Sequence, residues 1–314
     1  MAVLSFREPD SVDEACALLA ADPDNTRIIS GGTATVIMIR QRLIAPEHLV
    51  SVRDIPALRG ITRTAGVLRI GAAVTLREIA EASQVRTIAP SLATACGQVG
   101  NPRIRNVATL GGNLAEADYA SDPPSALVSL GATCHLAGPA GERELPAGRL
   151  ITGHYETALA PGELITHVDV PDPPGGRHAV YLKYRSRSSE DRACVGVAAR
   201  VDVEPGGGRP GSRVRAVDVV VAAVAATPQR VPAVLRAETG NRLDGALADR
   251  VARGYARAID PIDDARGSSG YRRRMIEVFV RRALSAVAEL TERTERTAPS
   301  GPDGATPAGG SPHD

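Results

Sequence analysis

The sequence predicts an α+β protein of two domains. In the first part of the chain, short apolar stretches typical of strands alternate with helical segments and with two paired-glycine loops. In the second part, three strand-like stretches come in succession and three helical segments follow them, an order that favours an α+β arrangement. The segment Asp172-Pro173-Pro174-Gly175-Gly176 separates the two parts and is typical of a domain boundary.

Capping residues and prolines mark the helices of the first domain. Ser11 followed by Glu14, and Thr75 followed by Glu78, are capping boxes that each predict the start of a helix. A proline pair at Pro123 predicts another start, because proline is tolerated in the first turn. The remaining predictions are strands at 27–30, 49–52, 67–70, 134–137 and 164–170, and helices at 34–42 and 88–99.

The second domain is predicted to be a small sheet followed by helices. Its strands are expected at 179–184, 194–203 and 214–224, and its helices at 231–237, 243–258 and 271–290. Gly206-Gly207-Gly208 is expected at a hairpin tip. Residues 291–314 are rich in Pro, Gly, Ser and Thr and are predicted to be disordered. The predicted division is therefore 1–175, 176–290 and a tail of 291–314.

Composition argues against several classes of protein. A formal net charge of +1 over 314 residues does not favour a nucleic-acid binder. The cysteines Cys16, Cys96, Cys134 and Cys194 stand far apart and the six histidines lack ligand spacing, so no metal site is expected. The longest apolar run, at 219–226, is too short for a membrane span, and no signal peptide is evident, so we expect a cytoplasmic protein.

Two glycine pairs stand out as a candidate binding site. They lie in Ser30-Gly31-Gly32-Thr33-Ala34-Thr35 and in Thr109-Leu110-Gly111-Gly112-Asn113. Glycine lets backbone N–H groups approach a ligand without a Cβ in the way, so two such loops can hold the phosphates of a dinucleotide. Either loop alone is equally typical of an ordinary tight turn.

Longer strings resemble a known family over roughly residues 1–290, in the same order. They resemble the FAD-binding medium subunits of molybdenum hydroxylases, of the carbon monoxide dehydrogenase and xanthine dehydrogenase type. The first string is Ser30-Gly31-Gly32-Thr33, followed by the segment 46–52. The others are the segments 69–75, 99–132 and 258–272, and the spaced residues Lys183, Arg187 and Asp191. The sequence departs from the family pattern at Ala34-Thr35, where many members carry Asp-Leu, and at Tyr119, where proline is usual.

The resemblance implies a split FAD-binding domain of the vanillyl-alcohol-oxidase type. This domain has two α/β subdomains, and a smaller C-terminal α+β domain with an antiparallel sheet and helices follows it. The pyrophosphate of FAD is expected between the two glycine loops. The residues implied in FAD binding are Ser30, Gly31, Gly32, Thr33, Ala34, Thr35, Thr109, Leu110, Gly111, Gly112, Asn113, Asp118, Asp122 and Lys183. The resemblance assigns no catalytic residue and no metal ligand.

Three of these residues have competing interpretations. Asp118 and Asp122 suit the ribose or adenine side of FAD, but each is equally suited to cap the helix that begins at Pro123. Lys183 is the only lysine of the chain, which favours a specific place facing the flavin, where its charge would stabilise reduced flavin. The alternative is a surface lysine with an ion-pair partner.

The implied function is electron transfer by an oxidoreductase subunit. FAD would accept electrons from iron–sulfur clusters on a small partner subunit and pass them to an external acceptor. A large subunit would hold the molybdenum cofactor, and the complex is expected as a dimer of heterotrimers. One alternative is a standalone FAD-dependent oxidase or dehydrogenase with the same type of FAD domain. A second is a non-catalytic assembly protein that keeps the fold, against which the intact glycine loops argue.

Overall fold

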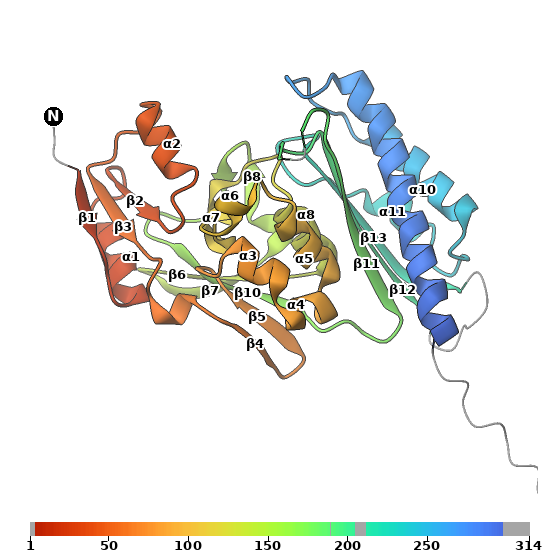
Figure 1. The fold of residues 1–314 in the computed structure, drawn as a ribbon, viewed down its shortest axis with the longest axis horizontal. Coiled ribbons are helices and arrows are strands. Elements are labelled where there is room, and N and C mark those ends of the chain that lie inside the picture. The colour runs from red at the N-terminus through yellow and green to blue at the C-terminus, as the bar shows by residue number, and fades with distance from the viewer. Residues whose placement is uncertain (1–3, 189, 205–211, 298–314) are drawn as a thin grey trace, which may run out of the picture.

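The computed structural model describes residues 4–188, 190–204 and 212–297. Figure 1 shows three parts side by side: an N-terminal subdomain, a central subdomain and a C-terminal domain. The fold is mixed, with three main sheets and helices on their faces, as the sequence predicts. Among these residues, no helix is both long and apolar enough to cross a membrane.

The N-terminal subdomain is a parallel three-stranded sheet with two helices. Its strand order is β1-β3-β2. The elements are β1 (Ser5–Arg7), α1 (Val12–Ala21), β2 (Thr26–Ile29), α2 (Thr35–Arg40) and β3 (His48–Ser51). As predicted, Ser11 caps α1: its hydroxyl accepts from the amide of Glu14 at 3.2 Å. The first glycine loop leaves the carboxyl end of β2, which is where sheets with parallel strands place ligand-binding loops.

The central subdomain is an antiparallel sheet of order β4-β5-β10-β6-β7 with helices packed on one face. Its strands are β4 (Ile61–Thr64), β5 (Val67–Gly71), β6 (Thr133–Gly138), β7 (Gly141–Pro146) and β10 (Leu164–Pro171), with a small pair β8 (Ile151–Gly153) and β9 (Glu156–Thr157). Its helices are α3 (Leu76–Glu81), α4 (Ser83–Ile88), α5 (Pro90–Gly97), α6 (Pro102–Arg105), α7 (Leu110–Glu116) and α8 (Pro123–Leu130), with single 3-10 turns at Pro56–Leu58 and Ala147–Arg149. Alternate residues such as Leu68, Ile70 and Val168 are fully buried beneath these helices.

The C-terminal domain is an antiparallel sheet of order β11-β12-β13 followed by helices. Its elements are β11 (Arg177–Tyr184), β12 (Val195–Val203), β13 (Val214–Ala222), α9 (Pro232–Arg236), α10 (Gly245–Ala258) and α11 (Ser269–Thr297). Helix α11 packs on one face of the sheet, while α5 and α8 of the central subdomain contact the other. Because both faces are covered, almost every residue of β12 is buried.

The structure differs from the sequence predictions at three helices. The second glycine segment, predicted as a loop, forms the first turn of α7. The segment predicted as one helix at 88–99 is split, because Pro90 cannot continue α4 and instead begins α5. Helix α11 runs on to Thr297, so the predicted disorder is wrong for 291–297. Thr291 is buried there and its hydroxyl donates to the carbonyl of Val287. Residues 298–314 and the predicted hairpin tip at 206–208 lie outside the described residues.

Candidate functional site

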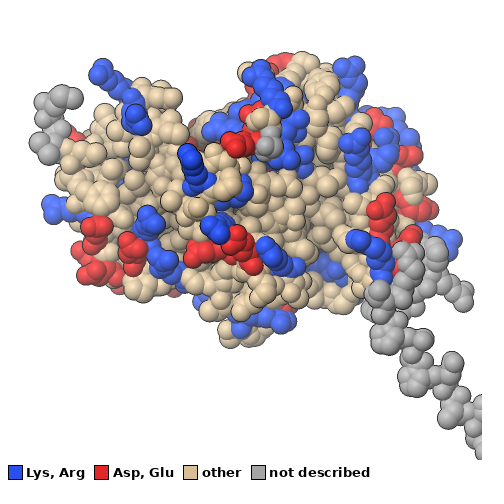
Figure 2. Space-filling view, viewed as in Figure 1, with Lys and Arg blue, Asp and Glu red and all other residues tan. Residues whose placement is uncertain are grey.

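Gly31 of the first glycine loop lies directly against Val107 and Ala108, which precede the second glycine loop, where the N-terminal and central subdomains meet. A Cβ built on Gly31 would overlap the carbonyl oxygen of Val107, lie 2.6 Å from that carbonyl carbon and lie 2.9 Å from the Cα of Ala108. Gly32 follows with φ of +66°, a conformation that favours glycine. Only a residue without a side chain at position 31 permits this approach. Figure 2 shows the surface hollowed beside the lobe that carries α2, above the region where Figure 1 places α6 and α7.

The first loop presents hydrogen-bond donors that the rest of the protein does not use. Within residues 4–188, 190–204 and 212–297, no group accepts from the amides of the four residues from Gly32 to Thr35. The hydroxyl oxygen of Ser30 is buried and has no hydrogen-bond partner in the same part of the chain. Consecutive free amides beside a buried free hydroxyl form an anion-binding concavity. This loop therefore fits the pyrophosphate of FAD.

The second loop differs from the prediction, because its amides are already bonded. The amide of Gly111 donates to the carbonyl of Ala72 at 2.8 Å, and that of Leu110 donates to Val74 at 3.0 Å. Thr109 caps α7: its hydroxyl accepts from Gly112 at 3.2 Å, and its carbonyl accepts from the amide of Asn113 at 2.9 Å. The expectation that Gly111 and Gly112 offer free N–H groups is therefore wrong.

The remaining donors of the second loop are side chains. The hydroxyl hydrogen of Thr109 stays available, because that oxygen only accepts in this structure. Asn113 accepts from Ser121 through Oδ1 at 2.8 Å, which leaves its Nδ2 as a donor. Gly111 serves close packing instead, since a Cβ there would lie 2.6 Å from the Cβ of Ala72. The side chain of Leu110 is fully buried in the core.

A basic cavity opens beside the second loop. It has a volume of about 280 Å³, and Val107 and Thr109 form part of its wall. Arg53, Arg59 and Arg77 also line it, against a single carboxylate, that of Glu78, so the charges on the cavity wall are mainly positive. The surroundings of the two loops thus favour an anionic ligand such as a dinucleotide.

Asp122 and Lys183 bind each other rather than facing an open site. Lys183 Nζ lies 2.7 Å from Asp122 Oδ2 and also donates to the carbonyl of Gln98 at 2.9 Å. The hydroxyl of Tyr181 donates to the other oxygen of Asp122. The two charged side chains are 1% and 3% exposed, so the pair is buried where the central subdomain meets the C-terminal domain. The structure thus shows an ion pair between two residues implied in FAD binding, and their contact with the cofactor stays a prediction.

Of the alternatives for these two residues, the helix cap at Asp122 and the surface position of Lys183 are wrong, whereas the ion-pair partner of Lys183 is present. Asp122 stands at the N-cap position of α8 but makes no side-chain capping bond, and Lys183 is not at the surface. Burial raises the pKa of the Asp122 carboxyl, and the ammonium of Lys183 and the hydroxyl of Tyr181 oppose that rise. The pair joins the start of α8 in the central subdomain to β11 in the C-terminal domain. It therefore connects the two parts of the chain through a buried ion pair.

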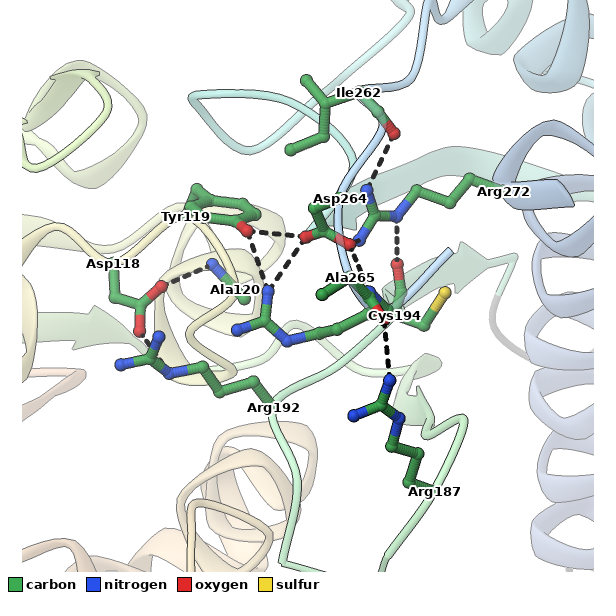
Figure 3. Close-up of polar contacts among 11 residues, drawn as sticks. Asp118, Tyr119, Ala120, Arg187, Arg192, Cys194, Ile262, Asp264, Ala265 and Arg272 are labelled. Atoms are coloured by element: carbon green, nitrogen blue, oxygen red, sulfur yellow. Dashed lines mark hydrogen bonds and ion pairs between the residues drawn. The ribbon is translucent and has the colours of Figure 1, made fainter. Parts of the chain in front are cut away.

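Asp118 and Tyr119 make a second polar connection to the C-terminal domain. Figure 3 shows Asp118 accepting from the amide of Ala120 at 3.0 Å and pairing with Arg192 at 2.8 Å. The hydroxyl of Tyr119 donates to Asp264 at 2.7 Å and accepts from Arg266 at 2.8 Å. The residue that departs from the family pattern therefore supplies a side-chain hydroxyl that a proline lacks.

Sequence reasoning missed the residues that receive these contacts. Asp264 also pairs with Arg272 at 2.7 Å, and Arg272 is fully buried while donating to the carbonyls of Cys194 and Ile262. Burial alone would raise the pKa of Asp264, but hydrogen bonds from Arg272 and Tyr119 outweigh burial and hold that pKa well below its usual range. The segment 258–272 is one of the strings that resemble the family, so the sequence singled it out. Tyr119 and Cys194, which Asp264 and Arg272 contact, lie far away in the sequence, so these contacts could not be predicted.

Removing the Tyr119 hydroxyl should weaken this connection. In Tyr119→Phe, Asp264 loses one donor and Arg266 loses one acceptor, and hydrogen bonds to charged groups contribute about 1.5–3 kcal/mol each. We expect the free energy of unfolding to fall by at least about 1.5 kcal/mol, the lower value for one such bond, measured by urea denaturation. Tyr155→Phe is the matched control, because Tyr155 is exposed. Equal stability of the two variants would contradict the role given to Tyr119.

Comparison with known proteins identifies the family. Residues 3–173 match the model of the FAD binding domain in molybdopterin dehydrogenase. Residues 180–287 match that of the CO dehydrogenase flavoprotein C-terminal domain. The chain belongs to this family. It is therefore an FAD-binding oxidoreductase subunit of the molybdenum hydroxylase type, as the resemblance implied.

Relatives cover nearly the whole chain. The carbon monoxide dehydrogenase medium chain of Afipia carboxidovorans is 32% identical over 89% of this chain and 94% of its own length. The alpha subunit of the 6-hydroxypseudooxynicotine dehydrogenase complex of Paenarthrobacter nicotinovorans is 32% identical over 88% and 91%. These relatives are medium or alpha subunits of multi-subunit complexes.

Solved structures of the family share the fold. The structure of the Cu,Mo-CO dehydrogenase aligns with a TM-score of 0.86 at 30% identity, over 91% of this chain and 98% of that one. Quinoline 2-oxidoreductase from Pseudomonas putida 86 aligns with a TM-score of 0.85 at 31% identity, over 92% and 98%. The predicted fold class, an FAD-binding domain followed by a smaller C-terminal domain, is confirmed.

Proposed function

We propose that this chain carries electrons from iron–sulfur clusters of a small partner subunit, through FAD, to an external acceptor. A large partner subunit would hold the molybdenum cofactor at which substrate is hydroxylated, and two such trimers would associate. In this proposal the chain spans 1–175 as FAD-binding domain and 176–290 as C-terminal domain. When bound, FAD supplies the redox chemistry, and the protein positions it and tunes it.

One observation carries the FAD site. Where the N-terminal and central subdomains meet, the buried hydroxyl of Ser30 has no hydrogen-bond partner in the described chain. The amides from Gly32 to Thr35 have no acceptor in the same residues. Asn113 Nδ2 and the Thr109 hydroxyl supply further donors from the opposite loop. These groups would bind the pyrophosphate. We therefore propose residues 30–35, Thr109 and Asn113 as the pyrophosphate-binding set, and Asp118, Asp122 and Lys183 stay proposed contacts to other parts of FAD.

The cysteines support a partner that carries the clusters. All four are free and buried, and within the described residues none of them joins a group of three metal-ligating side chains. Iron–sulfur clusters are held by several cysteine thiolates, so this chain has no cluster of suitable cysteines to offer. Free thiols also support a reducing compartment, and we propose that the complex is cytoplasmic.

The proposed role is tested by the source of electrons that reduces the flavin. The purified chain should carry FAD near one per chain, and acid precipitation should release that FAD into solution. In the isolated chain, xanthine, quinoline and carbon monoxide should leave the flavin oxidised, because the site where substrate reacts would lie on another subunit. A reduced partner subunit with iron–sulfur clusters should bleach the flavin. Rapid bleaching of the isolated chain by a small substrate would favour the standalone oxidase or dehydrogenase instead.

A further inference from the structure

A histidine pair lies on the face of the central sheet opposite helices α3 to α8. His135 on β6 is paired with His167 on β10 in the sheet register, and Asp169 follows on the same face of β10. The two imidazole rings stack with centroids 4.0 Å apart. His135 Nε2 lies 3.0 Å from Asp169 Oδ2, and His167 Nε2 lies 3.9 Å from Asp169 Oδ1. Three side chains that commonly bind metals thus converge, although 32 residues of chain separate the histidines.

A β-bulge at Thr166 fixes the orientation of His167. The register between β10 and β6 shifts between Ile165 and His167, so Thr166 is the additional residue. Its hydroxyl donates to the carbonyl of His135 at 3.1 Å and lies 3.0 Å from His167 Nδ1. A hydroxyl has a single hydrogen, so it can only accept from Nδ1. The hydrogen-bond network therefore assigns the proton of the neutral ring to Nδ1 and leaves the lone pair on Nε2.

That lone pair has no partner. His167 Nε2 is buried and makes no hydrogen bond within the described residues. It faces the carboxylate of Asp169, and two lone-pair groups at this separation repel each other unless a proton or a cation lies between them. We propose that His135, His167 and Asp169 form a binding site for one divalent transition-metal ion of the zinc class.

The ligand set and its surroundings fit such an ion. Tetrahedral zinc with ligands at about 2.0–2.1 Å places those ligands about 3.3 Å apart, and the two distances to Asp169 lie on either side of that value. Arg69 donates to both oxygens of Asp169, which orients the carboxylate and leaves a lone pair on each oxygen. Glu144 lies 3.7 Å from His135 Nδ1, where a carboxylate supports a ligating imidazole.

The charges and ligand types at this site favour a transition-metal ion over Mg²⁺ or Ca²⁺. Arg69 offsets the charge of Asp169, so two imidazoles supply most of the affinity. Imidazole ligands suit Zn²⁺, Cu²⁺ and Ni²⁺, whereas Mg²⁺ and Ca²⁺ need several oxygen ligands. The ion would cross-link β6 and β10 at the middle of the sheet. It would therefore stabilise the folded chain without taking part in electron transfer.

The test is zinc binding by the full-length chain with FAD bound. Competition with a chromogenic chelator should give one Zn²⁺ per chain, and Mg²⁺ should not compete. His167→Gln and His135→Gln should each weaken zinc binding about tenfold or more, while His48→Gln should not. His48 is the matched control, because it lies in another sheet and bonds Ser5. Zinc should also raise the thermal midpoint of the wild type, and not that of His167→Gln.

Two further measurements distinguish loss of the zinc site from a variant that fails to fold. FAD content should be unchanged in each variant, which separates this site from the proposed FAD site. X-ray absorption at the zinc edge of the wild type should show imidazole ligands. Absence of stoichiometric zinc binding, full binding in His167→Gln, or a wild-type spectrum without imidazole would each overturn the proposal.

Discussion

A single methyl group at position 31 should abolish FAD binding. In Gly31→Ala the new Cβ would overlap the Val107 carbonyl oxygen and come within 2.9 Å of the Ala108 Cα. These are backbone atoms, so the clash can be relieved only by moving the two glycine loops apart. The donors from Gly32 to Thr35 would then no longer face Thr109 and Asn113. We expect the Kd for FAD to rise at least about a hundredfold, or about 2.7 kcal/mol.

Fluorescence titration of the FAD-free chain measures this effect. Gly175→Ala is the matched control, because a Cβ at Gly175 meets no atom within 4 Å and its φ is not in the left-handed region. Far-UV circular dichroism shows whether the variant keeps its helices and strands. A folded Gly31→Ala chain that binds FAD as tightly as Gly175→Ala would contradict the close approach of the loops as the basis of the site.

Lys183→Met should destabilise the protein strongly. The substitution leaves Asp122 buried without its cation, and loss of one partner of a buried ion pair costs about 3–5 kcal/mol. Urea denaturation of the FAD-bound chain should show this loss. The double variant Asp122→Asn with Lys183→Met should recover much of it, because no charge is then left unpaired.

A redox titration separates this role from one at the flavin. If Lys183 only joins α8 to β11, the midpoint potential of FAD in Lys183→Met should stay close to that of the wild type. A wild-type stability combined with a lowered flavin potential would contradict the structural role. It would show instead that the ammonium acts on the reduced flavin.

The sequence predicted those features that depend on neighbouring residues. The capping box at Thr75 and Glu78 has both of its hydrogen bonds, and the linker at 172–176 lies between β10 and β11. The close backbone approach at Gly31 is likewise a property that the local glycine pair predicts, while the binding of FAD by this loop stays a prediction. Local patterns were sufficient in each of these cases.

Features that depend on distant pairing were missed or misjudged. The amide of Gly111 is bonded because Ala72, on a different segment, lies beside it. Lys183 was singled out correctly as unusual, but its partner Asp122 could be found only once β11 was placed against α8. His135 and His167 are brought together by the register of β6 and β10 and by the bulge at Thr166, and no spacing in the sequence shows this.

A crystal structure of the chain with FAD bound tests the central claim most directly. The claim is that the pyrophosphate of FAD binds between the first glycine loop and the second. We expect phosphate oxygens within about 2.7–3.2 Å of the amide nitrogens of Gly32 and Thr33. On the opposite side we expect contacts from Asn113 Nδ2 or the Thr109 hydroxyl. A pyrophosphate bound away from residues 30–35, with these amides still without an acceptor, would contradict the account.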